Sequence, residues 1–219
     1  MNKTGQIYLE IESVNKYSKE DVRIIAEAMI TGKIAILPTS TIYGLSCAYN
    51  NKPALDRIYE IKERPKILPF IVLIADIAYI DILADNKNAF AEVLIKKYWM
   101  SLSPRPVTII FKKNKNLPEF IAGRSDRIAL RLDCLKIITD VIKICGPIVS
   151  TSATVSGTGQ SPVSIAEIPE IIKNKADVIV CMKKNLAGVA STVVDITGGK
   201  PVIAREGKVS GREIMELFK

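Results

Sequence analysis

Short apolar runs recur along the chain at intervals that suit the strands of a sheet. The runs Ile34–Leu37 and Phe70–Ile74 are apolar throughout, which is typical of strands that are buried on both faces. Residues Gln6–Ile11 instead alternate between apolar and polar side chains, which predicts an edge or outer strand. The same reasoning predicts a short strand after Gly146-Pro147 and further strands over 107–111, 126–132, 178–181, 188–196 (a turn and a strand) and 202–205.

Helical patterns fill the intervals between these strands. Ser18 is a suitable N-cap for a helix that runs to about Ile30, and Gly32 would end it. The buried face of this helix is expected to contain Ile24, Ile25, Ala28 and Met29. Other helices are predicted over 53–62, 78–83, 88–98, 135–145, 164–173 and 211–218.

This interleaving of strands and helices predicts an α/β fold. The chain has no internal repeat, no low-complexity tract and no linker long enough to separate two domains. Its length of 219 residues also suits one large domain. We therefore expect a single domain over residues 1–219, with helices flanking a twisted, open sheet of mixed parallel and antiparallel strands.

Composition and charge narrow the chemistry. Hydrophobic residues make up 48% of the chain and charged residues 25%, which is typical of a globular protein, and the net charge of +8 predicts attraction to anions such as nucleotides or RNA. There is no histidine, which excludes histidine-based acid–base catalysis, and the four cysteines lack the spacing of a zinc site. We expect free thiols, no metal site, no membrane span and a cytoplasmic location.

Two hydroxyl-rich segments each follow an apolar strand. The first, Thr39-Ser40-Thr41, leads through a short connection into a helix that ends near Lys62 and Arg64. The second, Ser150-Thr151-Ser152, follows the short strand after Gly146-Pro147. Hydroxyl donors at the carboxyl end of a strand, with two cations nearby, suit a small anionic ligand on an open α/β sheet.

Each of these features has a simpler explanation when it is taken alone. The helix dipole favours cations at a helix end, which accounts for Lys62 and Arg64 without a ligand, and serine or threonine in turns is often a local cap. Arg131 and Arg205, however, also stand at the ends of predicted strands. Several cations without acidic or histidine partners suit a polyphosphate, which would be held without a Walker or GxGxxG motif because neither is present.

The hydroxyl-rich segments belong to longer motifs that follow one another along the chain. These are PTSTIYGLSC from Pro38, RIYEIKERPK from Arg57, PRPVT at 104–108, IALR at 128–131, STSATVSG at 150–157, GVASTVVD at 188–195 and AREG at 204–207. In this order they resemble the YrdC-type threonylcarbamoyl-AMP synthase family, whose signature reads PTETVYGL…IFxIKGRP. The resemblance runs from about Ile34 to Gly207, and the chain looks like the short, single-domain form of that family.

The resemblance implies a large basic cleft over the sheet and a nucleotidyltransferase that uses L-threonine, bicarbonate and ATP, with Mg²⁺ accompanying the ATP. Threonine and bicarbonate would form a carbamate that attacks the α-phosphorus of ATP and releases pyrophosphate. The product, threonylcarbamoyl-AMP, would pass to a separate tRNA-modifying threonylcarbamoyl transferase machinery, which makes threonylcarbamoyladenosine.

The same resemblance assigns residues to the two substrates. It implies that Thr41, Arg131, Ser150 and Ser191 bind threonine. It implies that Lys62, Arg64, Thr108, Ser152 and Arg205 bind ATP. Lys62 and Arg64 would also be the catalytic residues.

The chain departs from the family motifs at five positions. They are Ser40 for the glutamate of PTET, Leu68 for an acidic or amide residue, Leu73 for a histidine, Thr154 for an asparagine and Ala190 for a glutamate. Leu73 removes a polar contact usually offered to threonine, and Thr154 cannot make the paired contacts of an amide. Two interpretations remain: an active synthase whose contacts have shifted, or a paralogue like the YciO-type relatives, which binds nucleotide with weak or altered activity.

Two hypotheses of other classes remain open from the sequence. A basic concave surface permits binding of double-stranded or ribosomal RNA, although aromatic residues are only 6% of the chain and do not alternate with the basic ones. The chain could also be a structural remnant with an occluded cleft. Competition at low salt between RNA and ATP, with threonine and bicarbonate, would discriminate between them.

Overall fold

The computed structural model describes residues 5–13, 15–65, 69–85, 88–123, 125–157, 159 and 161–219. Its strands are β1 (Ile7–Ile11), β2 (Ala35–Pro38), β3 (Tyr43–Ala48), β4 (Ile71–Ile74), β5 (Val107–Lys112), β6 (Arg127–Leu132), β7 (Ile148–Ser152), β8 (Val178–Met182), β9 (Thr192–Asp195) and β10 (Val202–Arg205). The α-helices are α1 (Lys19–Ile30), α2 (Lys52–Ile61), α3 (Tyr79–Leu83), α4 (Ala89–Leu94), α5 (Lys136–Cys145), α6 (Glu170–Lys173) and α7 (Gly211–Glu216). Shorter helical turns are η1 (Ile95–Trp99), η2 (Glu119–Ala122) and η3 (Ile165–Glu167).

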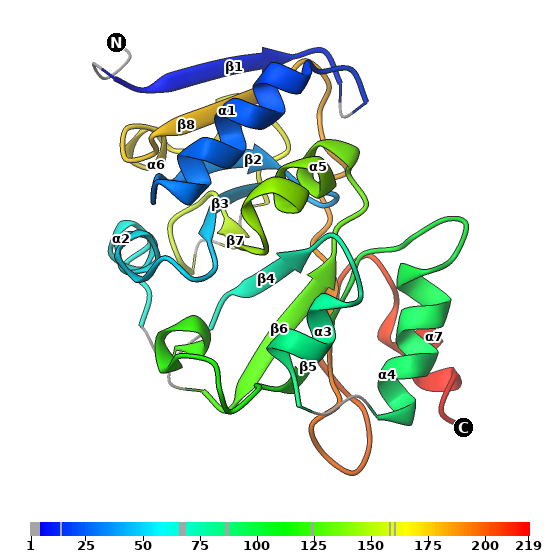
Figure 1. The fold of residues 1–219 in the computed structure, drawn as a ribbon. Coiled ribbons are helices and arrows are strands. Elements are labelled where there is room, and N and C mark those ends of the chain that lie inside the picture. Colours follow the sequence, from blue (N-terminus) through cyan, green and yellow to red (C-terminus); the bar gives the residue numbers. More distant parts are fainter. Residues whose placement is uncertain are drawn as a thin grey trace.

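All of these strands belong to one sheet, in the order β1-β8-β2-β3-β7-β4-β6-β5-β9-β10 (Figure 1). Parallel pairs join β1 to β8, β8 to β2, β4 to β6 and β5 to β9. The other neighbours are antiparallel, including the central strands β2, β3, β7 and β4. The sheet is therefore open and mixed, which confirms the predicted fold class.

The strand β3 is the element that the sequence did not reveal. Its residues belong to the stretch that was expected to be a short connection between the first hydroxyl-rich segment and the next helix, but they pair with β2 on one side and with β7 on the other. All six residues of β3 are buried, including Gly44 and Ser46, which are not typical strand residues. The pairing with two neighbours on the sheet overrides the weak local preference of these residues.

The helices follow the predicted pattern with two corrections. Ser18 caps α1 through a reciprocal pair of hydrogen bonds with Asp21, but Ile24 is only half-buried, whereas Val22 and Ala26 are buried with the predicted residues. The helix expected over 164–173 divides into η3 and α6 at Pro169. Proline lacks an N–H donor and disfavours helical backbone in the residue before it, so the chain cannot remain helical there.

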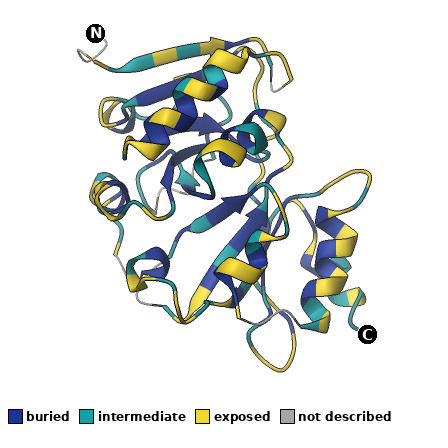
Figure 2. Ribbon diagram, viewed as in Figure 1, coloured by how far each residue is buried: buried dark blue, intermediate teal, exposed yellow. Residues whose placement is uncertain are grey.

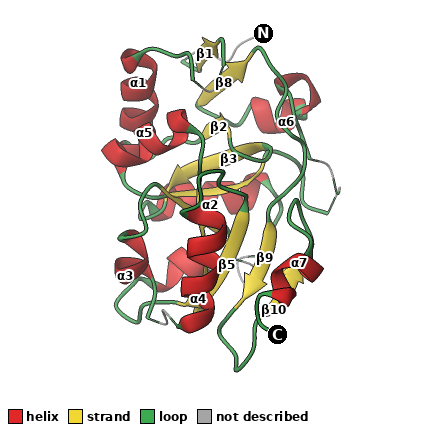
Figure 3. Cartoon of the chain, turned by 90° about the vertical axis from the view of Figure 1, so that its right-hand side faces the viewer, coloured by secondary structure: helices red, strands yellow, loops and turns green. Residues whose placement is uncertain are grey.

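Helices cover the sheet at both ends of the strand order. The pair α1 and α5 lies side by side over β2 and β3, whereas α4 and α7 lie together near β5, β9 and β10 (Figures 1 and 3). Phe90 and Phe218 join the latter helices through an edge-to-face contact with ring centroids 5.5 Å apart. Figure 2 shows the buried stripe of each helix turned to the sheet and the exposed stripe turned outward. The middle strands β7, β4 and β6 therefore lie between two helical groups.

None of the described helices is both long and apolar enough to cross a membrane. The cysteines at 47, 134, 145 and 181 are free thiols, and only Cys47 is fully buried. Burial raises the pKa of Cys47 to about 12, so this thiol stays protonated at neutral pH.

The cap of α1 gives a direct test of the fold. Replacing Ser18→Ala removes the acceptor for the Asp21 N–H, at 2.9 Å, and should lower the free energy of unfolding by about 1 kcal/mol. Ser164→Ala is the matched control, because Ser164 makes no side-chain cap and its hydroxyl bonds only the exposed Glu167. Urea denaturation measures both variants, and an equal loss in the two would contradict the capping role of Ser18.

Candidate functional site

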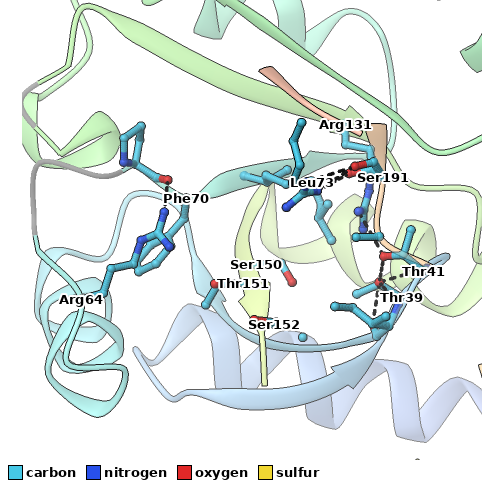
Figure 4. Close-up of a pocket in the computed structure, with 16 residues that line it drawn as sticks. Thr39, Thr41, Arg64, Phe70, Leu73, Arg131, Ser150, Thr151, Ser152 and Ser191 are labelled. Atoms are coloured by element: carbon cyan, nitrogen blue, oxygen red, sulfur yellow. Dashed lines mark hydrogen bonds between the residues drawn. The ribbon is translucent and has the colours of Figure 1, made fainter. Parts of the chain in front are cut away.

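A cavity of about 160 Å³ opens over one face of the middle strands (Figure 4). Its lining contains hydroxyl groups and three arginines beside a smaller apolar set. The residues are Thr39, Thr41, Ile42, Gly44, Arg64, Pro69, Phe70, Ile71, Leu73, Arg131, Ser150, Thr151, Ser152, Ala190, Ser191 and Arg205. None of these lining residues carries a carboxylate.

Strand register explains why residues so distant in sequence meet here. Gly44 pairs with Ser152, Ile71 with Ser150, and Leu73 with Arg131. Residues that are directly paired on neighbouring strands share a face of the sheet, as do residues two apart on one strand. The cavity therefore lies over the face of β3, β7, β4 and β6, and not only at the strand ends that the sequence suggested.

Gly44 lies close to the side chains of β7. A Cβ atom at this position would lie 2.2 Å from the Ser150 hydroxyl oxygen, so a larger residue would force the Ser150 side chain to move. Ser150 Oγ also accepts a hydrogen bond from Ser46 Oγ at 3.0 Å. Because Gly44 has no side chain, the cavity floor beside β7 is lined by serine hydroxyl groups.

The first hydroxyl-rich segment is the connection of the β2–β3 hairpin. Thr39 Oγ1 lies 3.0 Å from Thr41 Oγ1 and donates to the carbonyl of Ile42 at 2.7 Å. Arg131 Nη1 in turn donates to Thr41 Oγ1 at 3.2 Å. The segment is therefore fixed by its own hydroxyl groups and by a cation from β6.

Arg131 forms a buried ion pair with Asp133. Its Nη2 donates to Asp133 Oδ2 at 3.0 Å, and the side chains are 5% and 0% exposed. A charge can be buried at this depth only with a counter-ion and further hydrogen bonds. The Nε atom of Arg131 is nevertheless buried without a partner among the described residues.

Ser191 connects the segment before β9 with Arg205 of β10. Arg205 donates to the Ser191 carbonyl at 2.8 Å and to its hydroxyl at 3.1 Å, and Thr108 Oγ1 lies 2.8 Å from the same hydroxyl. Gly207 permits this approach, because a Cβ there would lie 2.4 Å from the backbone of Ser191. Arg205 and Ser191 consequently form one wall of the cavity.

Lys62 lies beneath the second hydroxyl-rich segment. Its ammonium donates to the carbonyls of Ser152 and Thr154 at 2.6 and 2.5 Å, and the residue is only 1% exposed. Burial, together with the charge of Arg64, lowers the pKa of Lys62 to about 8. In this structure the ammonium stabilises the turn after β7 and does not line the cavity.

Arg64 forms the side of the cavity opposite Arg131 (Figure 4). It follows Glu63, whose φ of 50° is left-handed, and its guanidinium lies 5.1 Å from the centroid of the Phe70 ring. The Tyr59 ring stacks on the Phe70 ring, with 4.3 Å between the two centroids. Burial lowers the pKa of Arg64.

Positive charge dominates the site. The three arginines line the same cavity. Burial lowers the pKa of Arg205, and the charges of Arg131 and Arg64 lower it further, which means that both groups repel the Arg205 guanidinium. Only Arg131 has a buried carboxylate partner among the hydrogen bonds and ion pairs described above. An anion in the cavity would relieve this repulsion, which makes the site suitable for carboxylate or phosphate groups.

The structure brings together most of the residues predicted to bind a ligand. Those that line the cavity are Thr41, Arg64, Arg131, Ser150, Ser152, Ser191 and Arg205. Lys62 and Thr108 lie behind the lining and bond to Ser152 and Ser191 respectively. Their predicted contacts with ATP remain predictions.

The five departures from the family motifs fall in different surroundings. Leu73 and Ala190 line the cavity, whereas Thr154 is buried beside it and bonds to Ser152 Oγ at 3.0 Å. Ser40 bonds to Asp133, as described below, and Leu68 lies outside the described residues. Two of the departures therefore change the cavity surface itself.

Sequence reasoning missed several residues of the site. Phe70 lines the cavity without having been singled out, and Asp133 supports it from behind. Thr39 and Thr151 also line it, although they had been named only as members of the hydroxyl-rich segments and not assigned to a substrate. Asp133 was detectable, because residues two apart on an extended chain share a face and Arg131 had already been selected. Phe70 gave no such signal, since a continuously apolar run does not say which of its side chains borders a cavity.

Comparisons with known proteins agree with the motifs. The family model described as "Telomere recombination", for Sua5, YciO and YrdC proteins, matches residues 27–207. The chain is 34% identical to the threonylcarbamoyl-AMP synthase of Pyrococcus abyssi, over 90% of this chain and 57% of that protein. It is 30% identical to the putative threonylcarbamoyl-AMP synthase of Methanocaldococcus jannaschii, over 95% of this chain and 94% of that protein. The chain thus spans less than three fifths of the Pyrococcus relative and nearly all of the Methanocaldococcus one.

Solved structures agree in fold. P. abyssi Sua5 complexed with L-threonine matches with a TM-score of 0.88 at 31% identity, covering 97% of this chain and 61% of that chain. E. coli YciO matches with a TM-score of 0.81 at 23% identity, covering 98% and 99%, which is a likeness of fold alone. Because the family model matches most of the chain and relatives at 30% identity or more cover nearly all of it, the chain belongs to the Sua5/YciO/YrdC family.

Proposed function

We propose that this protein is a threonylcarbamoyl-AMP synthase, which makes threonylcarbamoyl-AMP and pyrophosphate from L-threonine, bicarbonate and ATP. One observation carries the proposal. Arg131, Arg205 and Arg64 surround a single cavity whose floor is formed by serine and threonine hydroxyls and whose lining has no carboxylate. This chemistry suits a complex of one amino acid and one polyphosphate. Relatives that carry the name threonylcarbamoyl-AMP synthase support the same conclusion.

The amino acid would occupy the end of the cavity at Arg131. Its carboxylate would accept from the Nε of Arg131, which has no other partner among the described residues, and the Thr41 and Ser191 hydroxyls line the same end. The Pyrococcus relative, whose solved complex contains L-threonine, supports this choice of substrate. Ser150, on the floor, is available for the amine or hydroxyl group.

ATP would extend from Arg205 towards Arg64. Arg205 lines the cavity and donates to Ser191 at the end where the amino acid would bind, so it would meet the α-phosphate beside the carbamate. Arg64, beside the Phe70 ring, would bind the phosphates that leave, while Ser152, supported by Lys62, would hold the nucleotide from the floor. Such a site accelerates the reaction by positioning the reactants and neutralising the charge that develops on the phosphates.

The reaction balances when the ammonium group of threonine first loses a proton to the solvent. The threonine amine and bicarbonate give a carbamate and water, and a carbamate oxygen then attacks the α-phosphorus while the pyrophosphate leaves. Mg²⁺ would enter with ATP, because no group of three or more histidine, cysteine or acidic residues in the described part of the chain could hold a metal. The described residues fit a metal held mainly by phosphate oxygens and water.

The product is a reactive mixed anhydride, which must be consumed by an acceptor. We propose that a separate threonylcarbamoyl transferase machinery transfers the group to tRNA, and that this takes place in the cytoplasm. The net charge of +8 would favour an encounter with such a polyanionic assembly, or with RNA directly.

Pyrophosphate release tests the proposed reaction. With ATP, Mg²⁺, threonine and bicarbonate, the protein should release pyrophosphate and form threonylcarbamoyl-AMP, which mass spectrometry detects. Omission of either threonine or bicarbonate should abolish both signals. ATP turnover that does not depend on threonine, or no turnover at all, would contradict the proposal.

Arg64 should contribute to the affinity for ATP. Arg64→Ala removes a charge-assisted contact to phosphate and should weaken ATP binding by about 1.5–3 kcal/mol. Arg57→Ala is the control, because Arg57 pairs with Asp177 away from the cavity. If calorimetry finds the same ATP affinity in the Arg64 variant as in the unmodified protein, Arg64 does not contact the nucleotide.

Leu73 should weaken the discrimination between threonine and valine. Its side chain lies beside Arg131 on the neighbouring strand and adds apolar surface where the family has a polar residue. An apolar pocket rejects an exchange of hydroxyl for methyl by only about 100-fold, whereas paired polar groups reject it far more strongly. We expect a preference for threonine over valine below about 100-fold in pyrophosphate release. A much larger preference would show that the lost contact is replaced by another group.

A further inference from the structure

We propose that Asp133 is a positioning residue for the amino acid, although it does not line the cavity. Its carboxylate would hold Arg131 and the first hydroxyl-rich segment, Thr39-Ser40-Thr41, in the arrangement that receives the substrate carboxylate. The inference rests on the proposed function, because it concerns the same cavity and the same substrate.

The Asp133 carboxylate is completely buried, and both of its oxygen atoms accept hydrogen bonds. Its Oδ2 accepts from Arg131 Nη2 at 3.0 Å, from Ser40 Oγ at 3.0 Å and from the Ser40 backbone N–H at 3.3 Å. Its Oδ1 accepts from the Leu135 backbone N–H at 3.0 Å. One oxygen is thus directed at the site, and the other anchors the carboxylate to the chain that enters α5.

These bonds close a ring around the end of the cavity. Asp133 accepts a hydrogen bond from Ser40, which is covalently joined to Thr41. Thr41 accepts a hydrogen bond from Arg131, and Arg131 donates another one to Asp133. The ring restricts the rotation of Arg131 and Asp133, because neither side chain can turn without breaking two of these hydrogen bonds. The ring therefore fixes the guanidinium plane of Arg131.

The ring leaves one donor of Arg131 unused. Arg131 lines the cavity, and its Nε is buried without a partner among the described residues, whereas its Nη1 and Nη2 are both engaged. An acceptor from a ligand would complete the hydrogen bonds of the guanidinium, and a carboxylate is the acceptor that arginine binds most strongly. Asp133 thereby selects which edge of Arg131 is offered to the substrate.

Position 40 gives independent support. It is a point of departure from the family motif, which has an acid there, and here the serine hydroxyl donates to an acid that comes from the end of β6. The chain therefore retains a carboxylate at this end of the site, although a different strand provides it.

The variant Asp133→Asn tests the inference because an amide cannot reproduce the bonding pattern. If its NH₂ group takes the place of Oδ2, it meets the donors of Arg131 and Ser40. If it takes the place of Oδ1, it meets the Leu135 N–H. The first orientation opens the ring, and the second releases the carboxyl group from its anchor at Leu135. Both orientations also remove the negative charge that pairs with Arg131.

We expect Asp133→Asn to weaken threonine binding, measured by calorimetry, by about 10- to 100-fold and to change ATP binding by less than about threefold. In the pyrophosphate assay, the KM for threonine should rise while kcat at saturating threonine changes much less. A purely structural role would lower both affinities together. The control is Asp177→Asn, because Asp177 also bonds an arginine and a backbone N–H, but far from the cavity.

A second variant keeps the inference testable if Asp133→Asn does not fold. Ser40→Ala removes one bond of the ring and leaves the Arg131–Asp133 ion pair, so it should fold and should weaken threonine binding by about three- to tenfold. The inference is overturned if both variants bind threonine as tightly as the unmodified protein or more tightly. If Asp133→Asn does not fold, the same result for Ser40→Ala alone overturns it.

The two proposals fail in different ways. If the unmodified protein binds threonine but releases no pyrophosphate, the proposed reaction is wrong, and the positioning role is still decided by the calorimetry of the variants. If the unmodified protein is active and Asp133→Asn binds threonine equally well, only the positioning role is wrong. If the unmodified protein binds no threonine, the proposed substrate itself is contradicted.

Discussion

The positive charge of three guanidinium groups around one cavity is the constraint on which this site depends. Arg131, Arg205 and Arg64 come from three distant parts of the chain and line one cavity. Each is held by protein oxygens: Arg131 by Thr41 and Asp133, Arg205 by Ser191, and Arg64 by the Pro69 carbonyl. Only the first of these sets includes a carboxylate, so the cavity retains an excess of positive charge that an anionic ligand would neutralise.

The mixed sheet is what brings those arginines together. The antiparallel pair β3 and β7 is inserted between β2 and β4, and the β2–β3 connection meets the end of β6 through the bonds of Thr41 and Ser40. Gly44 leaves room for the side chains of β7, and Gly207 permits the close approach of the chain near Ser191. Buried Lys62 then holds the turn after β7 through two carbonyls. The cavity is thus lined by residues of the strands and of the segments that connect them.

Much of this arrangement was predictable from the sequence, because buried strands and capped helices leave strong local patterns. The runs that became β2 and β4, the Ser18 cap and the order of the motifs all gave the correct elements. The strand β3 did not, because its glycine and serine are stabilised by two neighbouring strands that no local pattern reveals. For the site, the sequence indicated Arg131 and Arg205 but not that Lys62 would be buried under a turn, since the direction of a lysine side chain depends on tertiary packing. Asp133 was overlooked because its partners lie on two separate segments.

A crystal structure of the protein with threonine and a non-hydrolysable ATP analogue would test the central claim most directly. This account predicts the threonine carboxylate within hydrogen-bond distance of Arg131 Nε, with the Arg131–Asp133 ion pair intact. It predicts the α-phosphate beside Arg205 and the remaining phosphates towards Arg64. A complex with the phosphates at Arg131, or with the amino acid outside the cavity, would contradict it.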